Sequence, residues 1–362
     1  MNQTSTEPAL APEGPVDQPP RSAPAPARRM PGARARARDF IGMQNLSLLV
    51  ALAILVAIID GRAPEFLEPS NMVNIGLAVS LLGLVAVVQT MVILAGGLDI
   101  SVGSIVGLAS VSSALAVAGT ENTAYGIFWG LLAGALCGLF NGALITFARV
   151  NPVITTLGTF TAFQGVSFIV TNGNTISVDN TAFNAIGSGT LVNVPIPIIV
   201  TAAVAAVFFI LMRYTDIGRN IYSIGGNPIA SRLAGLSLDR YRLGIYTVTG
   251  LICGLAGIIL TARSSAGIPA SGSQDLSLES ITAVVLGGAA LTGGRGTIVG
   301  TVLGVLLIGT LDNGLILTNV PSFYQMLARG ALLIIAVVIQ VWQGRAAGFL
   351  RGLGRSIGRE RP

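Results

Sequence analysis

Histidine and lysine are both absent from the 362 residues, so arginine supplies all 21 basic side chains. A P-loop needs a lysine to reach nucleotide phosphates, Schiff-base chemistry needs a lysine amine, and a Ser-His-Asp triad needs a histidine. The chain therefore carries no Walker-type ATPase site and none of these catalytic centres. No general base with a partnered acid stands out in its apolar stretches, so we predict that it is not an enzyme.

Charge is also scarce. Charged residues make up 10% of the chain and hydrophobic residues 52%, with a mean hydropathy of +0.75, whereas a soluble protein carries about 25% charged residues. One helical crossing of a bilayer takes about 20 apolar residues, so the length allows about ten crossings. The two cysteines, Cys137 and Cys253, lie in separate apolar runs, which favours buried small side chains over a disulfide framework or a metal site.

Ten apolar segments predict an all-α polytopic membrane protein with about ten transmembrane helices. They cover residues 40–59, 72–95, 98–118, 124–147, 152–171, 195–212, 243–262, 278–292, 297–317 and 324–342.

The arginines predict the orientation of these segments. If the N-terminus is cytoplasmic and all ten segments cross, only Arg62, Arg263 and Arg329 fall outside the cytoplasmic side, and both termini are cytoplasmic. Residues 1–39, rich in Pro, Ala and Arg, are predicted to be a disordered cytoplasmic arm, and 343–362 a basic cytoplasmic tail. Because the arginine cluster of the arm abuts a membrane span, we interpret it as a topology signal and expect no nucleic-acid partner.

The inner loop, residues 213–242, contains the signals of a short helix. Asn227 can cap the helix start, Pro228 fits the first helical position and Gly235 fits the stop, which predicts a helix over about 228–234. Three apolar side chains share one face of it: Ile229, Leu233 and Leu236. This face either packs on the protein's own cytoplasmic ends or docks to a partner.

Polar side chains within the spans are candidates to line a translocation pathway, because such groups are costly in a bilayer. They are Gln89, Asn141, Thr155, Thr156, Thr159, Gln164, Asp312 and Asn313. Asp312 and Asn313 could instead join helices. Hydroxyls and amides suit a neutral polyhydroxylated solute better than an ion, because the chain offers neither a titratable relay nor an acidic ring.

Glycine recurs at four-residue spacing in several spans, for example at Gly130, Gly134 and Gly138, which predicts close helix packing. A faint internal repeat is also visible. Gly96 and Gly97 in GGLDISVGSIVG align with Gly293 and Gly294 in GGRGTIVGTVLG.

Five motifs together resemble the ribose, xylose and galactose permeases of bacterial ABC importers. They are GGLDISVGS (96–104), NGALITFARVNPVITTLGTF (141–160), TNGNTI (171–176), GGNPIASRLAGL (225–236) and VVLGGAALTGGRGTIVGTVLG (284–304). The resemblance implies that residues 40–342 form the permease domain, with 213–242 as a cytoplasmic coupling loop and 172–194 as a periplasmic loop.

The resemblance also implies that the chain is a multi-pass protein of the bacterial cytoplasmic (inner) membrane. Its implied partners are a second permease chain (homodimer or heterodimer), a separate ATPase subunit that uses ATP and Mg, and an extracytoplasmic sugar-binding protein. This chain would bind no cofactor itself. The helix carrying Asn227, Pro228, Ala230, Arg232, Ala234 and Gly235 resembles the coupling helix that docks in the ATPase. The implied activity is import of a monosaccharide, a ribose-like pentose or a hexose. The alternatives are a branched-chain amino-acid ABC permease and an ATP-independent secondary carrier.

Overall fold

The computed structural model describes residues 43–272, 274–335, 337 and 338. The long helices are α2 (Met43–Asp60), α3 (Pro69–Leu94), α4 (Val102–Thr120), α5 (Thr123–Thr146), α6 (Pro152–Thr171), α8 (Ile196–Tyr214), α11 (Leu238–Ser264), α12 (Gln274–Leu286) and α13 (Ile298–Leu317). An apolar helix, Ser322–Ile335, follows α13. The short helices are η1 (Pro64–Leu67), α7 (Thr181–Ser188), α9 (Asp216–Gly226), α10 (Pro228–Leu233) and η2 (Pro269–Ser271).

Four two-residue strands complete the secondary structure of the described residues. They are β1 (Ile176–Ser177), β2 (Thr190–Leu191), β3 (Val194–Pro195) and β4 (Ala266–Gly267). β1 pairs with β4 and β2 with β3, both antiparallel. The secondary structure of the described residues is thus almost entirely helical, as the sequence predicts.

Seven helices are long and apolar enough to cross a membrane: α3, α4, α5, α6, α8, α11 and α13. Shorter apolar helices accompany them at Asn45–Asp60 and Ser322–Ile335. Nine of the ten apolar segments predicted from the sequence fall on these helices where the structure describes them, whereas the tenth, 278–292, falls on α12, which has only 13 residues. The predicted arm, 1–39, and tail, 343–362, lie outside the described residues.

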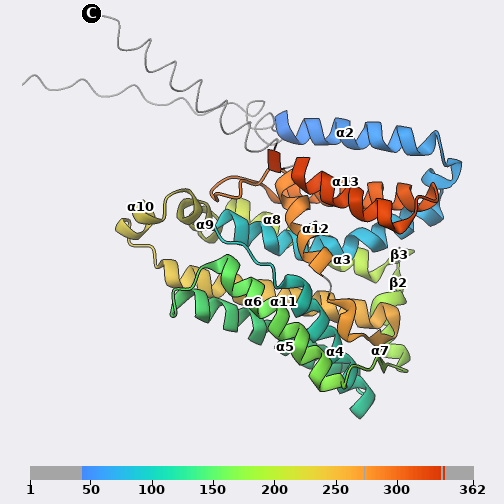
Figure 1. The fold of residues 1–362 in the computed structure, drawn as a ribbon, viewed down its shortest axis with the longest axis horizontal. Helices are drawn as coiled ribbons and strands as arrows, with labels where there is room; N and C mark the ends of the chain where they lie inside the picture. Colours follow the sequence, from blue (N-terminus) through green and yellow to red (C-terminus); the bar gives the residue numbers. More distant parts are fainter. Residues whose placement is uncertain (1–42, 273, 336, 339–362) are drawn as a thin grey trace, which may run out of the picture. The chain divides into compact units, whose positions relative to one another are not determined.

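Hydrogen bonds between connections define two ends of this helical body, which lie at opposite sides of the view in Figure 1. At the α7 end, the Asn180 side chain donates to the carbonyl oxygen of Glu121, and the Val178 amide donates to Ser265. At the α10 end, the connections 95–101, 215–237 and 287–297 meet. The polar loop 172–194 and the arginine-rich loop 213–242 are therefore at opposite ends.

Two local predictions differ from the structure. The apolar segment expected over 278–292 is helical only to Leu286, because Gly288 has a φ of +92°, the left-handed conformation in which helices commonly end, and the Ala289 amide donates back to the carbonyl oxygen of Val284. Helix α7 was expected only as part of a polar loop. It forms because Asn180 caps its start and Phe183 is completely buried against α4 and α11.

The interior is built on a glycine seam between α5 and α11. A Cβ on Gly134 would overlap the carbonyl oxygen of Gly250, and a Cβ on Gly250 would overlap that of Gly134. Gly138 and Gly254 extend the seam in both directions. Such close backbone approach replaces the hydrophobic drive that is missing in lipid, so the prediction of tight packing for these glycines is confirmed.

Candidate functional site

Helix α10 forms from strictly local signals and projects from the α10 end of the body (Figure 1). The Asn227 side-chain oxygen accepts a hydrogen bond from the Ala230 amide at 3.0 Å, and Pro228 occupies the first turn. Gly235 ends the helix with a φ of +86°, a conformation that favours glycine. Bounds and caps therefore agree with the sequence prediction.

The apolar face of α10 does not pack on the protein itself. The side chains of Ile229 and Leu233 are 75% and 86% exposed, and Leu236 is half-buried. Ala230, Arg232 and Ala234 are also exposed. Of the two interpretations of this face, docking to a partner is the one that its exposure favours, because exposed apolar patches mark interaction sites.

Helix α9 contacts α10 and anchors it to the rest of the protein. The hydroxyls of Ser223 and Ser231 share a hydrogen bond of 2.9 Å, and the Tyr222 hydroxyl donates to the carbonyl oxygen of Gly296 at 2.9 Å. Burial raises the pKa of the Tyr222 hydroxyl above its ordinary value of 10.0, an effect that the nearby Arg213 charge opposes. The phenol therefore keeps its proton, and this hydrogen bond, at neutral pH.

Glycines from three consecutive pairs, 96–97, 225–226 and 293–294, meet close to the start of α10. Gly225 of α9 packs so tightly that an added Cβ would overlap the carbonyl oxygen of Leu94 and lie 2.7 Å from the amide nitrogen of Gly294. A Cβ on Gly293 would lie 2.9 Å from the Cα of Gly96. The two glycine motifs that echo each other in the sequence are therefore neighbours in space. We call this contact of Gly96, Gly225, Gly293 and Gly294 the glycine junction.

A buried polar cluster surrounds the connection between α3 and α4. Asp99 Oδ1 accepts hydrogen bonds from the Ser101 amide at 2.8 Å and the Ser101 hydroxyl at 2.6 Å. The Asn141 amide nitrogen donates to the Ser101 hydroxyl at 2.7 Å. The Thr156 hydroxyl donates to the carbonyl oxygen of Pro152 at 2.9 Å and lies 3.4 Å from that of Leu98. The structure therefore brings two predicted pathway residues, Asn141 and Thr156, to one place.

Three other predicted pathway residues are buried on nearby helices, and a fourth is half-buried. Gln89 on α3 is fully buried, Thr155 and Thr159 on α6 are each 5% exposed, and Gln164 on α6 is half-buried. Neither polar atom of the Gln89 side chain, nor the Thr155 hydroxyl, has a hydrogen-bond partner among the described residues. Buried polar groups normally have partners, so these unpartnered atoms are exceptions among the buried polar groups.

Asp312 and Asn313 lie elsewhere and join helices. Asp312 accepts a hydrogen bond from Arg329 at 3.0 Å, and Arg329 also forms an ion pair with Glu279 at 2.8 Å. The side-chain amides of Asn313 and Asn71 exchange two hydrogen bonds, of 2.8 and 2.9 Å, between α13 and α3. Of the two roles that the sequence left open for these residues, interhelical contact is the one that their bonds display.

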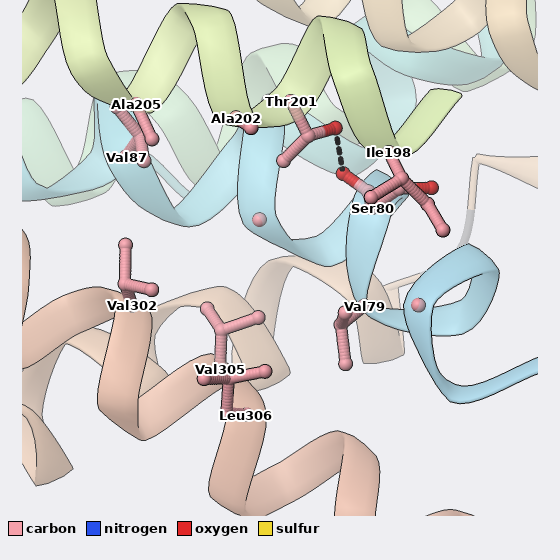
Figure 2. Close-up of a pocket in the computed structure, with 12 residues that line it drawn as sticks. Val79, Ser80, Val87, Ile198, Thr201, Ala202, Ala205, Val302, Val305 and Leu306 are labelled. Carbon is pink, nitrogen blue, oxygen red and sulfur yellow. Dashed lines mark hydrogen bonds between the residues drawn. The ribbon is translucent and has the colours of Figure 1, made fainter. Parts of the chain in front are cut away.

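A cavity of about 200 Å³ lies between α3, α8 and α13, and Figure 2 shows its lining. Val79, Val87 and Val305 are among its mostly aliphatic walls. The hydroxyl of Thr201 at its edge donates to the carbonyl oxygen of Ser80 at 2.9 Å. Burying a sugar hydroxyl without a hydrogen bond is costly, so this cavity does not suit a sugar.

Sequence reasoning missed Gly225 as a functional candidate, although the run GGNP that contains it was visible directly before α10. It also missed the partners of Arg329, because nothing local links this residue to Glu279. Among the described residues, no group of three or more cysteine, aspartate or glutamate side chains is arranged to hold a metal ion.

Membrane-length helices around a buried polar cluster, with an apolar helix projecting beyond them, define a multi-pass membrane permease. Residues 71–337 match the family profile described as "Branched-chain amino acid transport system / permease component". The chain belongs to this family, and is a transport component without an ATPase domain.

Similar proteins include sugar permeases that match over nearly their whole length. The ribose import permease protein RbsC of Bacillus subtilis (strain 168) is 42% identical over 299 residues, which cover 82% of this chain and 92% of the relative. The L-arabinose ABC transporter permease protein AraH of Azospirillum brasilense is 36% identical over 326 residues, 90% of this chain and 96% of the relative. The L-arabinose transport system permease protein AraH of Escherichia coli (strain K12) is 37% identical over 299 residues, 83% of this chain and 91% of the relative. No solved structure gives a significant match.

Proposed function

We propose that the chain is the permease subunit of an ABC importer that moves a pentose such as ribose or L-arabinose into the cell. The observation that carries this function is the exposed apolar face of α10, Ile229 and Leu233, on a helix that is capped and held from behind. A carrier that works alone has no use for such a docking helix. The coupling residues are Asn227, Pro228, Ala230, Arg232, Ala234 and Gly235.

The substrate class follows from the polar cluster and from the relatives. The ribose and L-arabinose permeases match this chain over more than nine tenths of their length. Amide and hydroxyl groups such as those of Asn141 and Thr155 can exchange hydrogen bonds with a neutral sugar. A branched-chain amino acid would instead bring an ammonium and a carboxylate, for which the cluster offers no charge pair.

Transport then proceeds by alternating access. The glycine junction connects α10 to the end of α3, so movement of the docked helix reaches the helices of the polar cluster. The proposed pathway is lined by Gln89, Asn141, Thr155, Thr156, Thr159 and Gln164. The unpartnered polar atoms of Gln89, Asn141 and Thr155 become accessible as the helices part. Asp312 and Asn313, which the sequence analysis placed with them, act by holding α13 to its neighbours.

The remaining proposals concern topology and partners. Ten crossings with both termini cytoplasmic place the arginine-rich 213–242 loop against a separate ATPase subunit, which would use ATP and Mg. The polar 172–194 loop at the α7 end then faces the periplasm, where a sugar-binding protein would dock. A second permease chain, identical or not, would complete the pathway.

The test is transport into vesicles that contain this chain, its ATPase and its binding protein. Leu233→Asp should lower ATP-driven sugar uptake at least about tenfold, because it places a charge where apolar surface is buried on docking. The protein should remain in the membrane at its normal level. Leu233→Met, which preserves the apolar contact, should transport normally.

Three outcomes contradict the proposal. Normal uptake by Leu233→Asp would remove α10 from the coupling step. Sugar that equilibrates without ATP in vesicles containing this chain alone would establish a secondary carrier. Leucine, offered in parallel with ribose and L-arabinose, tests the amino-acid alternative, because stimulation of the ATPase by leucine alone would overturn the sugar assignment.

A further inference from the structure

A groove of about 370 Å³ lies between α8, α9 and α11, with α3 as its floor. Seven apolar side chains line it: Met91, Phe208, Leu211, Ile217, Ile221, Ile245 and Val248. Gly244 also lines it, and an added Cβ there would meet no other atom within 4 Å. The surface of α11 is therefore open along this groove.

The groove runs from the apolar parts of α8 and α11 to the polar ends of these helices. The apolar run of α8 ends at Arg213, and α11 carries Arg240 and Arg242 in its first turns before its own apolar run begins. Phe208 and Val248 therefore line the hydrocarbon side of the groove, whereas Arg240 and Tyr241 line its aqueous side. An occupant must be apolar at one end and polar at the other.

The polar end of the groove favours an anion. Arg240 is exposed and forms no ion pair with another described residue, whereas Arg219 in the same loop is paired with Asp216. The Tyr241 hydroxyl accepts a hydrogen bond from the Asn220 side chain at 2.6 Å, so its own proton is free to be donated. A guanidinium and a phenol at the edge of the hydrocarbon suit a phosphate group.

We propose that this groove binds one anionic phospholipid from the leaflet at the α10 end. Its phosphate contacts Arg240 and the Tyr241 hydroxyl, and one acyl chain lies along Gly244 and Val248. The volume is within the range of about 300–1,000 Å³ that is usual for small-molecule sites. A helix of a second chain, about 10 Å across, is wider than an acyl chain.

The experiment is native mass spectrometry of the full chain in detergent, titrated with phosphatidylglycerol or with phosphatidylcholine of the same acyl chains. Wild-type protein should retain one phosphatidylglycerol in preference to phosphatidylcholine. Arg240→Gln should weaken phosphatidylglycerol binding about fivefold, since a basic residue near a membrane surface contributes about that factor. Arg240→Lys should retain most of the affinity.

Two control pairs separate the site from general effects. Gly244→Leu fills the groove and should abolish retention of both lipids, whereas Gly158→Leu, at an equally open glycine on α6, should not. Arg219→Gln removes a positive charge that is already paired and should leave binding unchanged.

Equal affinity for the two lipids, or equal effects of Arg240→Gln and Arg219→Gln, would overturn the assignment. A change in oligomeric mass caused by Gly244→Leu, without loss of lipid, would also overturn it and give the groove to a second chain. None of these readouts requires the ATPase or a sugar. The lipid site can therefore fail without the transport function failing, and the reverse also holds.

Discussion

The backbone amide of Gly294 donates a hydrogen bond to the carbonyl oxygen of Leu94, with an N···O distance of 2.9 Å. This bond joins the end of α3 to the turn before α13, and Gly225 at the end of α9 lies against both partners. Helix α10 begins only three residues after Gly225. The glycine junction thus connects the proposed ATPase contact to two membrane helices through backbone contacts alone.

Gly225→Ala should therefore destabilise the protein by about 1–3 kcal/mol, the usual cost of overpacking. The added methyl overlaps the Leu94 carbonyl oxygen, so α9 has to shift away from α3. Thermal unfolding in detergent gives the stability, and ATP-driven uptake gives the coupling. The matched control is Gly226→Ala, because a Cβ at Gly226 meets nothing within 4 Å. Equal behaviour of the two variants would show that the junction is not tightly packed.

Arg329→Met should cost about 3 kcal/mol of stability, the lower end of the range for breaking a buried ion pair, because the Arg329 side chain is 32% exposed. The change leaves Glu279 and Asp312 as partly buried carboxylates without their cation. Adding Glu279→Gln and Asp312→Asn to the same chain should recover most of the lost stability. Arg62→Met, at an exposed arginine, is the control and should be nearly neutral. Failure of the triple variant to recover would mean that packing, rather than charge, is the larger contribution of Arg329.

The amide pair of Asn71 and Asn313 should show measurable coupling. A double-mutant cycle with Asn71→Leu and Asn313→Leu should give an interaction free energy of about 0.6–1.7 kcal/mol, the range found for polar contacts between membrane helices. Asn71 also donates to the carbonyl oxygen of Phe66 at 2.8 Å, so its single substitution should be the more costly. If the effects of the two substitutions on the free energy of unfolding are strictly additive, the two side chains do not interact.

Gly134→Leu should disrupt the seam between α5 and α11. The backbones meet at Gly250 with no room for a side chain, so the variant should express poorly or lose thermal stability. Gly165→Leu on α6, where an added Cβ meets nothing within 4 Å, should be tolerated. Comparing their yields and melting temperatures in the same detergent tests the seam, and equal tolerance would contradict it.

Local signals account for what could be predicted from the sequence. Helix α10 needs only Asn227 at its start, Pro228 in its first turn and Gly235 after its end, all within nine residues, so its bounds were predictable. The helical positions of the spans follow from their apolar content in the same way. Phe183 shows the limit of this approach, because its complete burial depends on α4 and α11 rather than on its polar neighbours.

Contacts between distant residues were not predictable. Asn71 and Asn313 are 242 positions apart, and nothing in either segment identifies the other as its partner. Polar residues such as Asp312 and Asn141 have the same appearance in a hydropathy profile, although one joins helices and the other belongs to the buried cluster.

The glycine junction also has a consequence for biogenesis. Its parts come from positions near 95, 225 and 294, so the support behind α10 cannot form until the last third of the chain has been synthesised and inserted. A nascent or truncated chain that ends before Gly293 would present α10 without this support. Recruitment of the ATPase would then depend on a completely inserted chain, and an incomplete subunit would fail to assemble instead of blocking the transporter.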